Sequence, residues 1–388
     1  MKNRFKSSEE VAVNKDKIQK IIESHELKYL PSVSADSKDG LVLEVNCFPA
    51  AAEIYKEGFV QKTVEAAIKM SNLQKSPLEI VLLIEDFTQH AGYLKNAEKW
   101  FEDISKLNGQ QVRKRTFKEF GNETASLIVS NSDLRFEDAA RKIILSGIPC
   151  FPSQYAGWWR RSKIGTSKQI DGLCESHSLN PSLIQPDYSY VVYEEFCKEV
   201  FETLKKKTGE MLEKYPKGVF VKQAAGTQGY GGMYISSIED YNKKDVRETL
   251  SIKRGFRGSK IHGFLIQRCL DSMNFNVQTR EEELKLIREE EMPAEFYFIM
   301  VADANLRASI YEVFLRIGPT KANHNLNKPG EFFKRFQLDD LVCLGLSEED
   351  FEAAHLSALF SYVATDIQIK KFVENPDLDE KTIYSLKN

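Results

Sequence analysis

Two polar residues near the start of the chain, Glu44 and Asn46, have types and spacing that suit metal binding. They lie in residues 39–49, which read DGLVLEVNCFP: a turn followed by a short apolar strand over 41–47. Because side chains at positions i and i+2 of a strand point to the same face, both could supply oxygen atoms to one hard cation such as Mg²⁺. The alternative is a polar pair on an exposed edge strand that binds no metal, and the choice between the two interpretations depends on the rest of the sequence.

A glycine-rich turn follows a Val-Phe-Val strand that ends at Lys222. Four glycines punctuate it, namely Gly226, Gly229, Gly231 and Gly232. Glycines let backbone N–H groups approach a phosphate without a Cβ in the way, and the Lys222 ammonium offers a point charge. The motif lacks the Walker A ending and is followed by a strand, so it is not a dinucleotide-binding fingerprint either. The alternative interpretation is a glycine-rich hairpin with an exposed lysine that binds no phosphate.

Two further features flank this turn along the chain. Upstream, Lys168 stands at the start of a predicted helix, with Lys163 in WWRRSK as the competing lysine. Downstream, a buried strand over 263–271 ends in a hinge whose backbone could pair with an adenine edge. The hinge residues are Gln267, Arg268, Cys269 and Leu270, and Asp271 follows as a candidate partner for ribose hydroxyls.

Three polar residues complete the set. Arg316 lies on a predicted strand, Asn325 belongs to an Asn-rich loop, and Asp366 is the single acid of a predicted strand over 362–369. In this order the residues resemble the ATP-grasp superfamily. In that family the strand that carries the Asp is followed, across a hairpin, by a strand reading Glu-x-Asn, and these three residues hold magnesium ions.

No Glu-x-Asn pair follows Asp366, and the missing strand is LVLEVN at the other end of the chain. The sequence therefore resembles a circularly permuted ATP-grasp enzyme, cut in the hairpin between its two metal-bearing strands. Its arrangement is similar to that of eukaryotic glutathione synthetase and glutathionylspermidine synthetase. Two departures are Gln223, where Pro is common in the family, and a glycine loop without the metal-binding acid of eukaryotic glutathione synthetase.

The resemblance implies an ATP-dependent ligase that joins a carboxylate to an amine through an acylphosphate and releases ADP and phosphate. Its substrates would be amino acids or short peptides, and its cofactors ATP and Mg²⁺. Glu44, Asn46 and Asp366 would bind the metal, and Arg316, Asn325 and Lys222 would act in catalysis. The residues implied at the nucleotide are Lys168, Lys222, Gly226, Thr227, Gln228, Gly229, Gly231, Gly232, Gln267, Arg268, Cys269, Leu270 and Asp271. An ATP-binding regulatory or scaffold protein of the same fold, without ligase turnover, is the alternative.

The elements that must position these residues alternate between strands and helices over 77–155, which predicts a small Rossmann-like domain. Its first strand, LEIVLLI, is a nearly continuous apolar run of the kind that buried parallel strands show. We expect an α/β protein with α+β lobes, namely a permuted ATP-grasp fold preceded by this domain. The predicted units are 1–76 with the Glu-x-Asn strand, 77–155, 156–262 with the glycine-rich hairpin, and 263–388.

Further elements follow from hydrophobic periodicity. Helices are predicted over 8–28, 58–72, 94–107, 136–146, 193–214 and 347–361. Strands are predicted over 111–117, 126–130, 295–302 and 308–317, with another near Ser182 after a helix capped by Ser167. The charged stretch 279–291 is predicted to be a solvated helix or an insertion.

Bulk properties exclude several functional classes. The 388 residues carry 54 Lys and Arg against 57 Asp and Glu, a net charge of −3, so no basic field argues for nucleic acid or an anionic membrane. No apolar run approaches the roughly 20 residues that a membrane span needs, and the N-terminus lacks the apolar core of a secretory signal. Six cysteines without a metal-ligand spacing indicate reduced thiols in a cytoplasmic protein. Permuted relatives are often dimers, so a homodimer is compatible with the resemblance.

Overall fold

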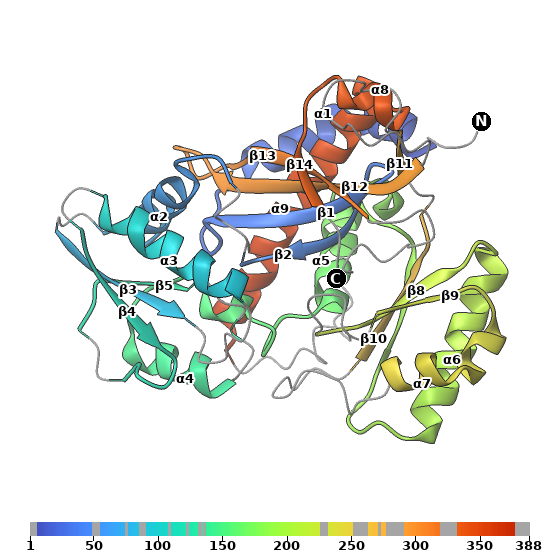
Figure 1. The fold of residues 1–388 in the computed structure, drawn as a ribbon, viewed down its shortest axis with the longest axis horizontal. Helices are drawn as coiled ribbons and strands as arrows, with labels where there is room; N and C mark the ends of the chain where they lie inside the picture. Colours follow the sequence, from blue (N-terminus) through green and yellow to red (C-terminus); the bar gives the residue numbers. More distant parts are fainter. Residues whose placement is uncertain are drawn as a thin grey trace.

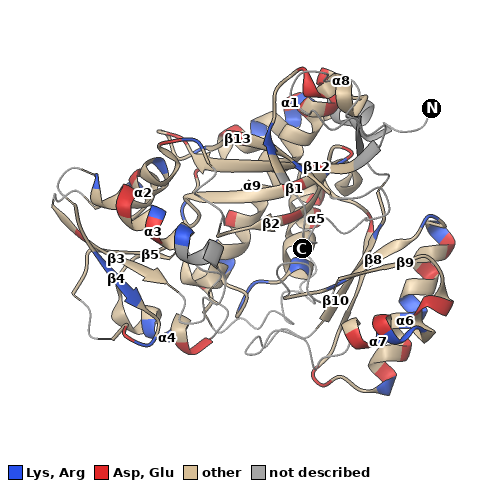
Figure 2. Ribbon diagram, in the orientation of Figure 1, with Lys and Arg blue, Asp and Glu red and all other residues tan. Residues whose placement is uncertain are grey.

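The computed structural model describes residues 6–48, 55–73, 77–84, 91–107, 110–121, 124–130, 134, 137–225, 232–250, 263–270, 273–276, 291–318 and 332–376. The strands in these residues form three sheets (Figure 1). In the described part of the chain, no helix combines the length and the apolar character needed to cross a bilayer. Acidic and basic residues are interspersed on helices such as α6 (Lys198–Lys214) and α7 (Lys244–Leu250) (Figure 2), in keeping with the near-neutral net charge.

The largest sheet is antiparallel, with strand order β14-β13-β12-β1-β2 and β11 paired to β12. Its strands are β1 (Ser32–Lys38), β2 (Leu41–Asn46), β11 (Met273–Asn276), β12 (Glu291–Ala302), β13 (Ala308–Ile317) and β14 (Phe332–Arg335). Strand β1 runs along β12 with Ser32 opposite Val301 and Ser37 opposite Phe296. The N-terminal hairpin thus completes a sheet whose other strands come from the last third of the chain.

Strands β1 and β2 are joined by the two-residue turn Asp39-Gly40, whose φ angles are 50° and 75°. Positive φ at both central positions is the requirement of a type I′ turn, and Asp-Gly is a preferred pair for it. The hairpin sets Asp36 directly opposite Glu44. Because opposed residues of an antiparallel pair point to the same face, this turn and a register shift between Asp36 and Ser37 together bring the two acidic side chains into proximity.

One face of the large sheet is covered by helix α9 (Glu348–Glu374), which begins with a capping box of Ser347 and Asp350. Helices α1 (Lys6–Ser24) and α5 (Lys163–Ser176) pack on α9, and the short helix α8 (Asp340–Leu344) precedes it. The predicted strand over 362–369 is wrong, because α9 continues through it. Side chains are buried almost all round this part of the helix, so no polar stripe reveals a helical period.

The parallel sheet confirms the predicted Rossmann-like alternation, with strand order β4-β3-β5-β6. Its strands are β3 (Leu78–Ile84), β4 (Gln110–Thr116), β5 (Leu127–Ser130) and β6 (Cys150–Phe151), and the helices between and before them are α2 (Phe59–Met70), α3 (Ala91–Ser105) and α4 (Glu137–Ser146). Helix α2 packs both on α3 and on β12 of the large sheet. The two sheets therefore share a core around Phe59, Trp100 and Ile299.

The third sheet is antiparallel, with strand order β7-β10-β8-β9. Its strands are β7 (Tyr188–Val192), β8 (Val219–Gln223), β9 (Met233–Ile235) and β10 (Gly263–Arg268), and its helices are α6 (Lys198–Lys214) and α7 (Lys244–Leu250), with short 3₁₀ turns at Gln154–Ala156, Pro181–Leu183 and Ile238–Asn242. Helices α6 and α7 bury one face of this sheet around Leu204 and Phe264. The other face packs Leu265 against Ile164 of α5.

Two local predictions in this region are wrong. Helix α5 is capped by Ser162, whose side chain accepts a hydrogen bond from the Gly165 N–H, and Ser167 lies inside the helix. Residues near Ser182 form a 3₁₀ turn, because Asn180 caps it and Pro181 occupies its first position. All six cysteines lie in described residues, and none of them forms a disulfide bond.

Candidate active site

A cluster of polar side chains lies on the face of the large sheet opposite α9, where the hairpin meets β12 and β13. Asp36 comes from β1, Glu44 and Asn46 from β2, Glu295 from β12 and Arg316 from β13. Neighbouring residues of the same strands, such as Val45 and Phe296, point the other way into the core beneath α9. Strand alternation therefore gathers the polar residues on one side. We call these five residues, with Lys163 and Lys222, the polar cluster.

Arg316 holds the two acids nearest to it. Its Nη1 lies 3.0 Å from Glu295 Oε1 and 3.5 Å from Asp36 Oδ1. The Asn46 amide donates to Asp36 Oδ2 at 3.4 Å. Four neighbouring strands thus contribute one continuous set of contacts.

Two lysines approach the acids from other elements. Lys163, in the first turn of α5, places its Nζ 2.9 Å from Glu44 Oε1, and its side chain is only 8% exposed. Lys222, on β8 of the third sheet, donates to Gln267 Oε1 at 2.9 Å. The cluster therefore joins the large sheet, the third sheet and the N-terminus of α5.

The electrostatics of the cluster are strongly perturbed. Burial, reinforced by the neighbouring Glu295, raises the pKa of Asp36 to about 8, although Arg316 opposes this shift. Burial also acts to raise the pKa of Glu44, but the nearby Lys163 and Lys222 outweigh it, so the pKa of that carboxyl is lowered. Burial lowers the pKa of Lys222, with Glu44 acting against it. Strongly shifted pKa values in one cluster are typical of functional sites.

The oxygen donors of the cluster fit a hard divalent cation by type. Asp36, Glu44 and the Asn46 amide supply oxygens from paired strands, and burial together with the neighbouring Glu295 carboxylate raises the pKa of Asp36. In the described residues, however, no group of three or more His, Cys, Asp and Glu side chains is arranged as a ready-made metal site. The carboxylates are instead paired with Arg316 and Lys163.

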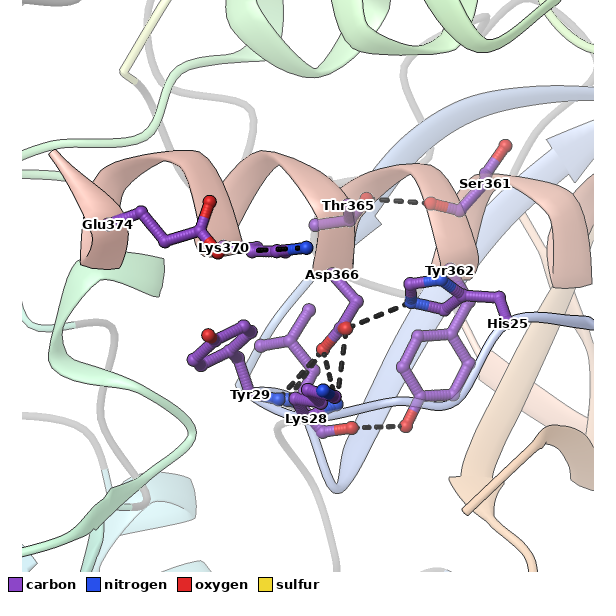
Figure 3. Close-up of polar contacts among 10 residues, drawn as sticks. His25, Lys28, Tyr29, Ser361, Tyr362, Thr365, Asp366, Lys370 and Glu374 are labelled. Atoms are coloured by element: carbon purple, nitrogen blue, oxygen red, sulfur yellow. Dashed lines mark hydrogen bonds and ion pairs between the residues drawn. The ribbon is translucent and has the colours of Figure 1, made fainter. Parts of the chain in front are cut away.

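Asp366 does not belong to this cluster, and its predicted position on a strand beside Glu44 is wrong. It lies on α9, which packs on the opposite face of the large sheet. Its carboxylate is 1% exposed and accepts hydrogen bonds from the backbone N–H groups of Lys28, Tyr29 and Leu30 (Figure 3). Its oxygens are therefore committed to the chain segment that leads into β1.

Two further side chains complete the contact around Asp366. His25 Nε2 lies 3.1 Å from Asp366 Oδ2, and the Tyr362 hydroxyl donates to the Leu30 carbonyl at 2.6 Å (Figure 3). The carboxylate thus ties residues 25–30, near the start of the chain, to the helix near its end. Asp366 therefore has a structural role, whereas the sequence predicted that it binds a metal ion.

The structure distinguishes the two candidate upstream lysines. Lys163 contacts Glu44, whereas the Nζ of Lys168 lies 5.1 Å from the centre of the Tyr190 ring on β7. Lys168 therefore stands beside the third sheet, on the side that faces α5. The preference for Lys168 over Lys163 finds no support in these contacts.

The predicted hinge residues end β10, and they point in different directions. The Gln267 side chain faces Lys222, whereas the Arg268 guanidinium lies 5.8 Å from the ring of Tyr215, at the end of α6. The backbone N–H groups of Arg268 and Cys269 donate to carbonyls of Asp187 and Gly218. Leu270 is buried. Neither Arg268 nor Cys269 thus presents its N–H to a ligand in this conformation.

Several predicted site residues lie outside the described part of the chain. They are Gly226, Thr227, Gln228, Gly229, Gly231, Asp271 and Asn325. Gly232 is described and comes directly before β9, which pairs with β8 as the predicted hairpin requires. The predictions for the other residues stand as predictions.

Sequence reasoning missed Asp36 and assigned no role to Glu295. The Asp39-Gly40 pair alone does not predict this position, because a regular two-residue hairpin would set Asp36 opposite Leu43. Only a register shift between Asp36 and Ser37 sets Asp36 opposite Glu44, and no local pattern marks that shift. Glu295 could have been found from its partner, since β12 and β13 pair it directly with Arg316.

Comparison with known proteins supports the fold through structure rather than sequence. No protein-family model matches the sequence, and no curated protein matches it either. A solved structure of a candidate gamma-glutamylcysteine synthetase from Methylobacillus flagellatus matches with a TM-score of 0.64 and 17% identity, over 94% of this chain and 95% of that one.

Two more distant structures also match. A D-alanyl-alanine synthetase A from Vibrio cholerae has a TM-score of 0.42 and 11% identity, over 72% of this chain and 80% of that one. A glutathione synthetase-like effector from Globodera pallida has a TM-score of 0.41 and 11% identity, over 86% and 83%. The first match, which spans nearly the whole of both chains, establishes the fold.

Proposed function

We propose that this chain, which has the ATP-grasp fold, is an ATP-dependent ligase that joins a carboxylate to an amine and releases ADP and phosphate. The observation that carries the proposal is the polar cluster, in which acids from the hairpin and β12 meet cations from β13, α5 and β8. ATP in complex with a divalent cation suits such a site, because its anionic phosphates match the basic residues and its cation matches the acidic ones. Amino acids or short peptides are the proposed substrates, since the structurally similar synthetases are named for products of this kind.

Each part of the cluster has a role in this proposal. Lys163, Lys222 and Arg316 would bind phosphate oxygens, because they are the cations that meet at the junction of the sheets. Asp36, Glu44 and Asn46 would hold Mg²⁺, with Asp36 in place of Asp366. When bound, Mg²⁺ offsets the charge of the phosphate groups. The glycine-rich segment after β8 keeps its predicted place over the phosphates, and Asn325 its predicted catalytic role.

The reaction would proceed in two steps. The substrate carboxylate attacks the γ-phosphorus in line, which forms an acylphosphate and releases ADP. The amine then attacks the acyl carbon, and phosphate leaves with the C–O bond electrons. Arg316 and Lys222 supply fixed positive charge for both steps, since positioning and electrostatic stabilisation are the main means of catalysing phosphoryl transfer. The burial of Arg316 away from water strengthens this effect.

A circular permutation remains part of this proposal, with the cut moved. The β1–β2 hairpin is intact, so the cut does not lie inside it. Helix α9 ends the described chain on the same sheet to which β1 belongs, and residues 28–30 contact it through Asp366. We place the cut between α9 and β1.

The experiment is ADP release from ATP and Mg²⁺ over a pooled library of amino acids and small peptides. The wild type should show substrate-dependent release, and Glu44→Gln and Asp36→Asn should each reduce it by about 100-fold or more. Glu374→Gln, an exposed acid on α9, is the matched control and should be as active as the wild type.

The outcomes separate the candidate functions. ATP binding without turnover on any pool would favour the regulatory or scaffold protein over the ligase. If ATP does not bind, or if the two variants are as active as Glu374→Gln, the proposed site is wrong.

A further inference from the structure

Strand β2, which carries Glu44 and Asn46, is an edge strand of the large sheet. Among the described residues, no strand pairs with its outward backbone groups, and other parts of the chain bond to them instead. The Val42 N–H donates to the Ile184 carbonyl at 2.8 Å. The carbonyl of Val45, which lies between the two proposed metal ligands, accepts a hydrogen bond from Arg161 Nη1 at 3.1 Å.

Arg161 is a buried cation with a defined orientation. Its side chain is 2% exposed, its Nε donates to the Ala156 carbonyl at 3.1 Å, and its Nη1 also approaches Thr166 Oγ1 at 3.4 Å. One guanidinium thus links β2 to the 3₁₀ turn Gln154–Ala156 and to the first turns of α5. The planar group holds these partners in one fixed geometry, which a flexible ammonium cannot reproduce.

The Trp158 ring packs against the cationic groups of both Arg161 and Lys163. The Arg161 guanidinium lies 4.3 Å from the Trp158 ring centre, and the Lys163 ammonium lies 4.5 Å from it. Both distances fall within the range of cation–π interactions. Because Lys163 in turn contacts the Glu44 carboxylate, the segment 156–163 holds β2 twice, through the Val45 backbone and the Glu44 side chain.

We infer that Arg161 and Trp158 are positioning residues that set the register of Glu44 and Asn46 for the divalent cation, an inference that rests on the proposed function. Neither residue belongs to the polar cluster. Arg161 acts through the Val45 carbonyl, and Trp158 acts through the two cations on its ring. Residues that orient metal ligands typically change metal affinity by 10- to 100-fold when they are replaced.

The test compares nucleotide binding with and without the metal. Binding of the Mn²⁺–ADP complex is followed by electron paramagnetic resonance of Mn²⁺, and binding of ADP alone is measured by calorimetry in EDTA. Arg161→Lys keeps the positive charge but not the planar group. It should weaken Mn²⁺–ADP binding by about tenfold and leave the affinity for ADP alone within about twofold of the wild type.

Arg160→Lys is the matched control. Arg160 is the neighbouring arginine, but its guanidinium donates to the Pro376 carbonyl instead of contacting β2, so this variant should bind Mn²⁺–ADP like the wild type. Circular dichroism checks that each variant is folded. If Arg161→Lys does not fold, Trp158→Phe decides the question, with an expected loss of about threefold in Mn²⁺–ADP affinity alone.

Three results would overturn the inference. Unchanged Mn²⁺–ADP binding in the folded variants would show that Arg161 and Trp158 do not position the ligands. Equal weakening of ADP and Mn²⁺–ADP would assign them a merely structural role in the nucleotide site. If the wild type binds ADP no more tightly with Mn²⁺ than without it, the metal site of the proposed function is wrong as well. This result is seen in the wild type alone, whereas the first two results are seen only in the variants.

Discussion

Asp36 is buried against a second carboxylate, and Arg316 only partly offsets this repulsion. Its folded-state pKa of about 8 lies far above the value near 4 in an unfolded chain. The folded protein therefore holds a proton that the unfolded chain releases between these two pH values. It follows that the contribution of Asp36 to stability falls as the pH rises through this range.

At the residue scale, we predict that Asp36→Asn removes this dependence. In the absence of divalent cations, the wild type should lose stability between about pH 5 and about pH 8, by up to about 1.4 kcal/mol per pH unit at the steepest point. The variant should show a flatter profile and be more stable than the wild type at the upper end. Urea denaturation across this range measures both.

Added Mg²⁺ provides the internal control for that experiment. It should stabilise the wild type more at the upper end of the range, where Asp36 is ionised, and stabilise Asp36→Asn less. Parallel pH profiles for the two proteins, with and without Mg²⁺, would contradict the prediction.

At the level of elements, the β1–β2 turn and the register shift between Asp36 and Ser37 determine which side chains meet. Gly40 has a φ of +75°, and a Cβ there would meet Ala353 at 3.7 Å, which is an ordinary contact. Strain in the backbone is therefore the main cost of a side chain at this position. Asp39, with a φ of 50°, tolerates the same region because short polar residues do so.

We predict that Gly40→Ala lowers the free energy of unfolding by about 1 kcal/mol, whereas Asp39→Asn leaves it within about 0.5 kcal/mol. Chemical denaturation of the two variants beside the wild type measures the difference. A neutral Gly40→Ala would show that this turn does not need its positive φ values.

The same elements show why the sequence predicted some parts of the fold and not others. LEIVLLI was assigned correctly because a continuous apolar run of seven residues fits a buried parallel strand. YVATDIQI was assigned to a strand because its β-branched residues alternate, yet it is helical. Burial all round α9 removes the polar stripe that marks most helices, so local pattern alone could not separate the two states.

That misassignment also explains the error in the site. With a strand at 362–369, Asp366 was the natural partner for Glu44, and Asp36 was overlooked. Strand periodicity and motif order predicted Glu44, Asn46, Lys222 and Arg316, and the structure brings these four residues together in the polar cluster. The contacts of Arg161 with β2 are set by tertiary packing between segments 116 residues apart, so no local pattern carries them.

At the scale of the whole molecule, Asp366 joins the two ends of the chain. A buried carboxylate that accepts three backbone N–H groups is costly to alter, because amide donors in place of its oxygens would leave N–H groups unpaired (Figure 3). We predict that Asp366→Asn lowers the free energy of unfolding by about 3 kcal/mol. The midpoint of urea denaturation measures this loss.

Glu374→Gln on the same helix is the control. Glu374 is about half exposed and pairs only loosely with Lys370 at 3.6 Å, so its replacement should change stability by less than about 0.5 kcal/mol. Equal midpoints for the two variants would show that Asp366 does not hold the ends of the chain together.

The pairing of β1 with β12 has a consequence for synthesis of the chain. The hairpin leaves the ribosome long before residue 291, so β1 must wait with an open edge until its partner is made. An open strand edge invites aggregation while it waits. Its sequence SVSADSK is mostly polar, which lowers that risk, and its serines become buried only when the last third of the protein arrives. The composition of β1 thus suits a segment that is translated long before its partner strand and is buried only after that strand is made.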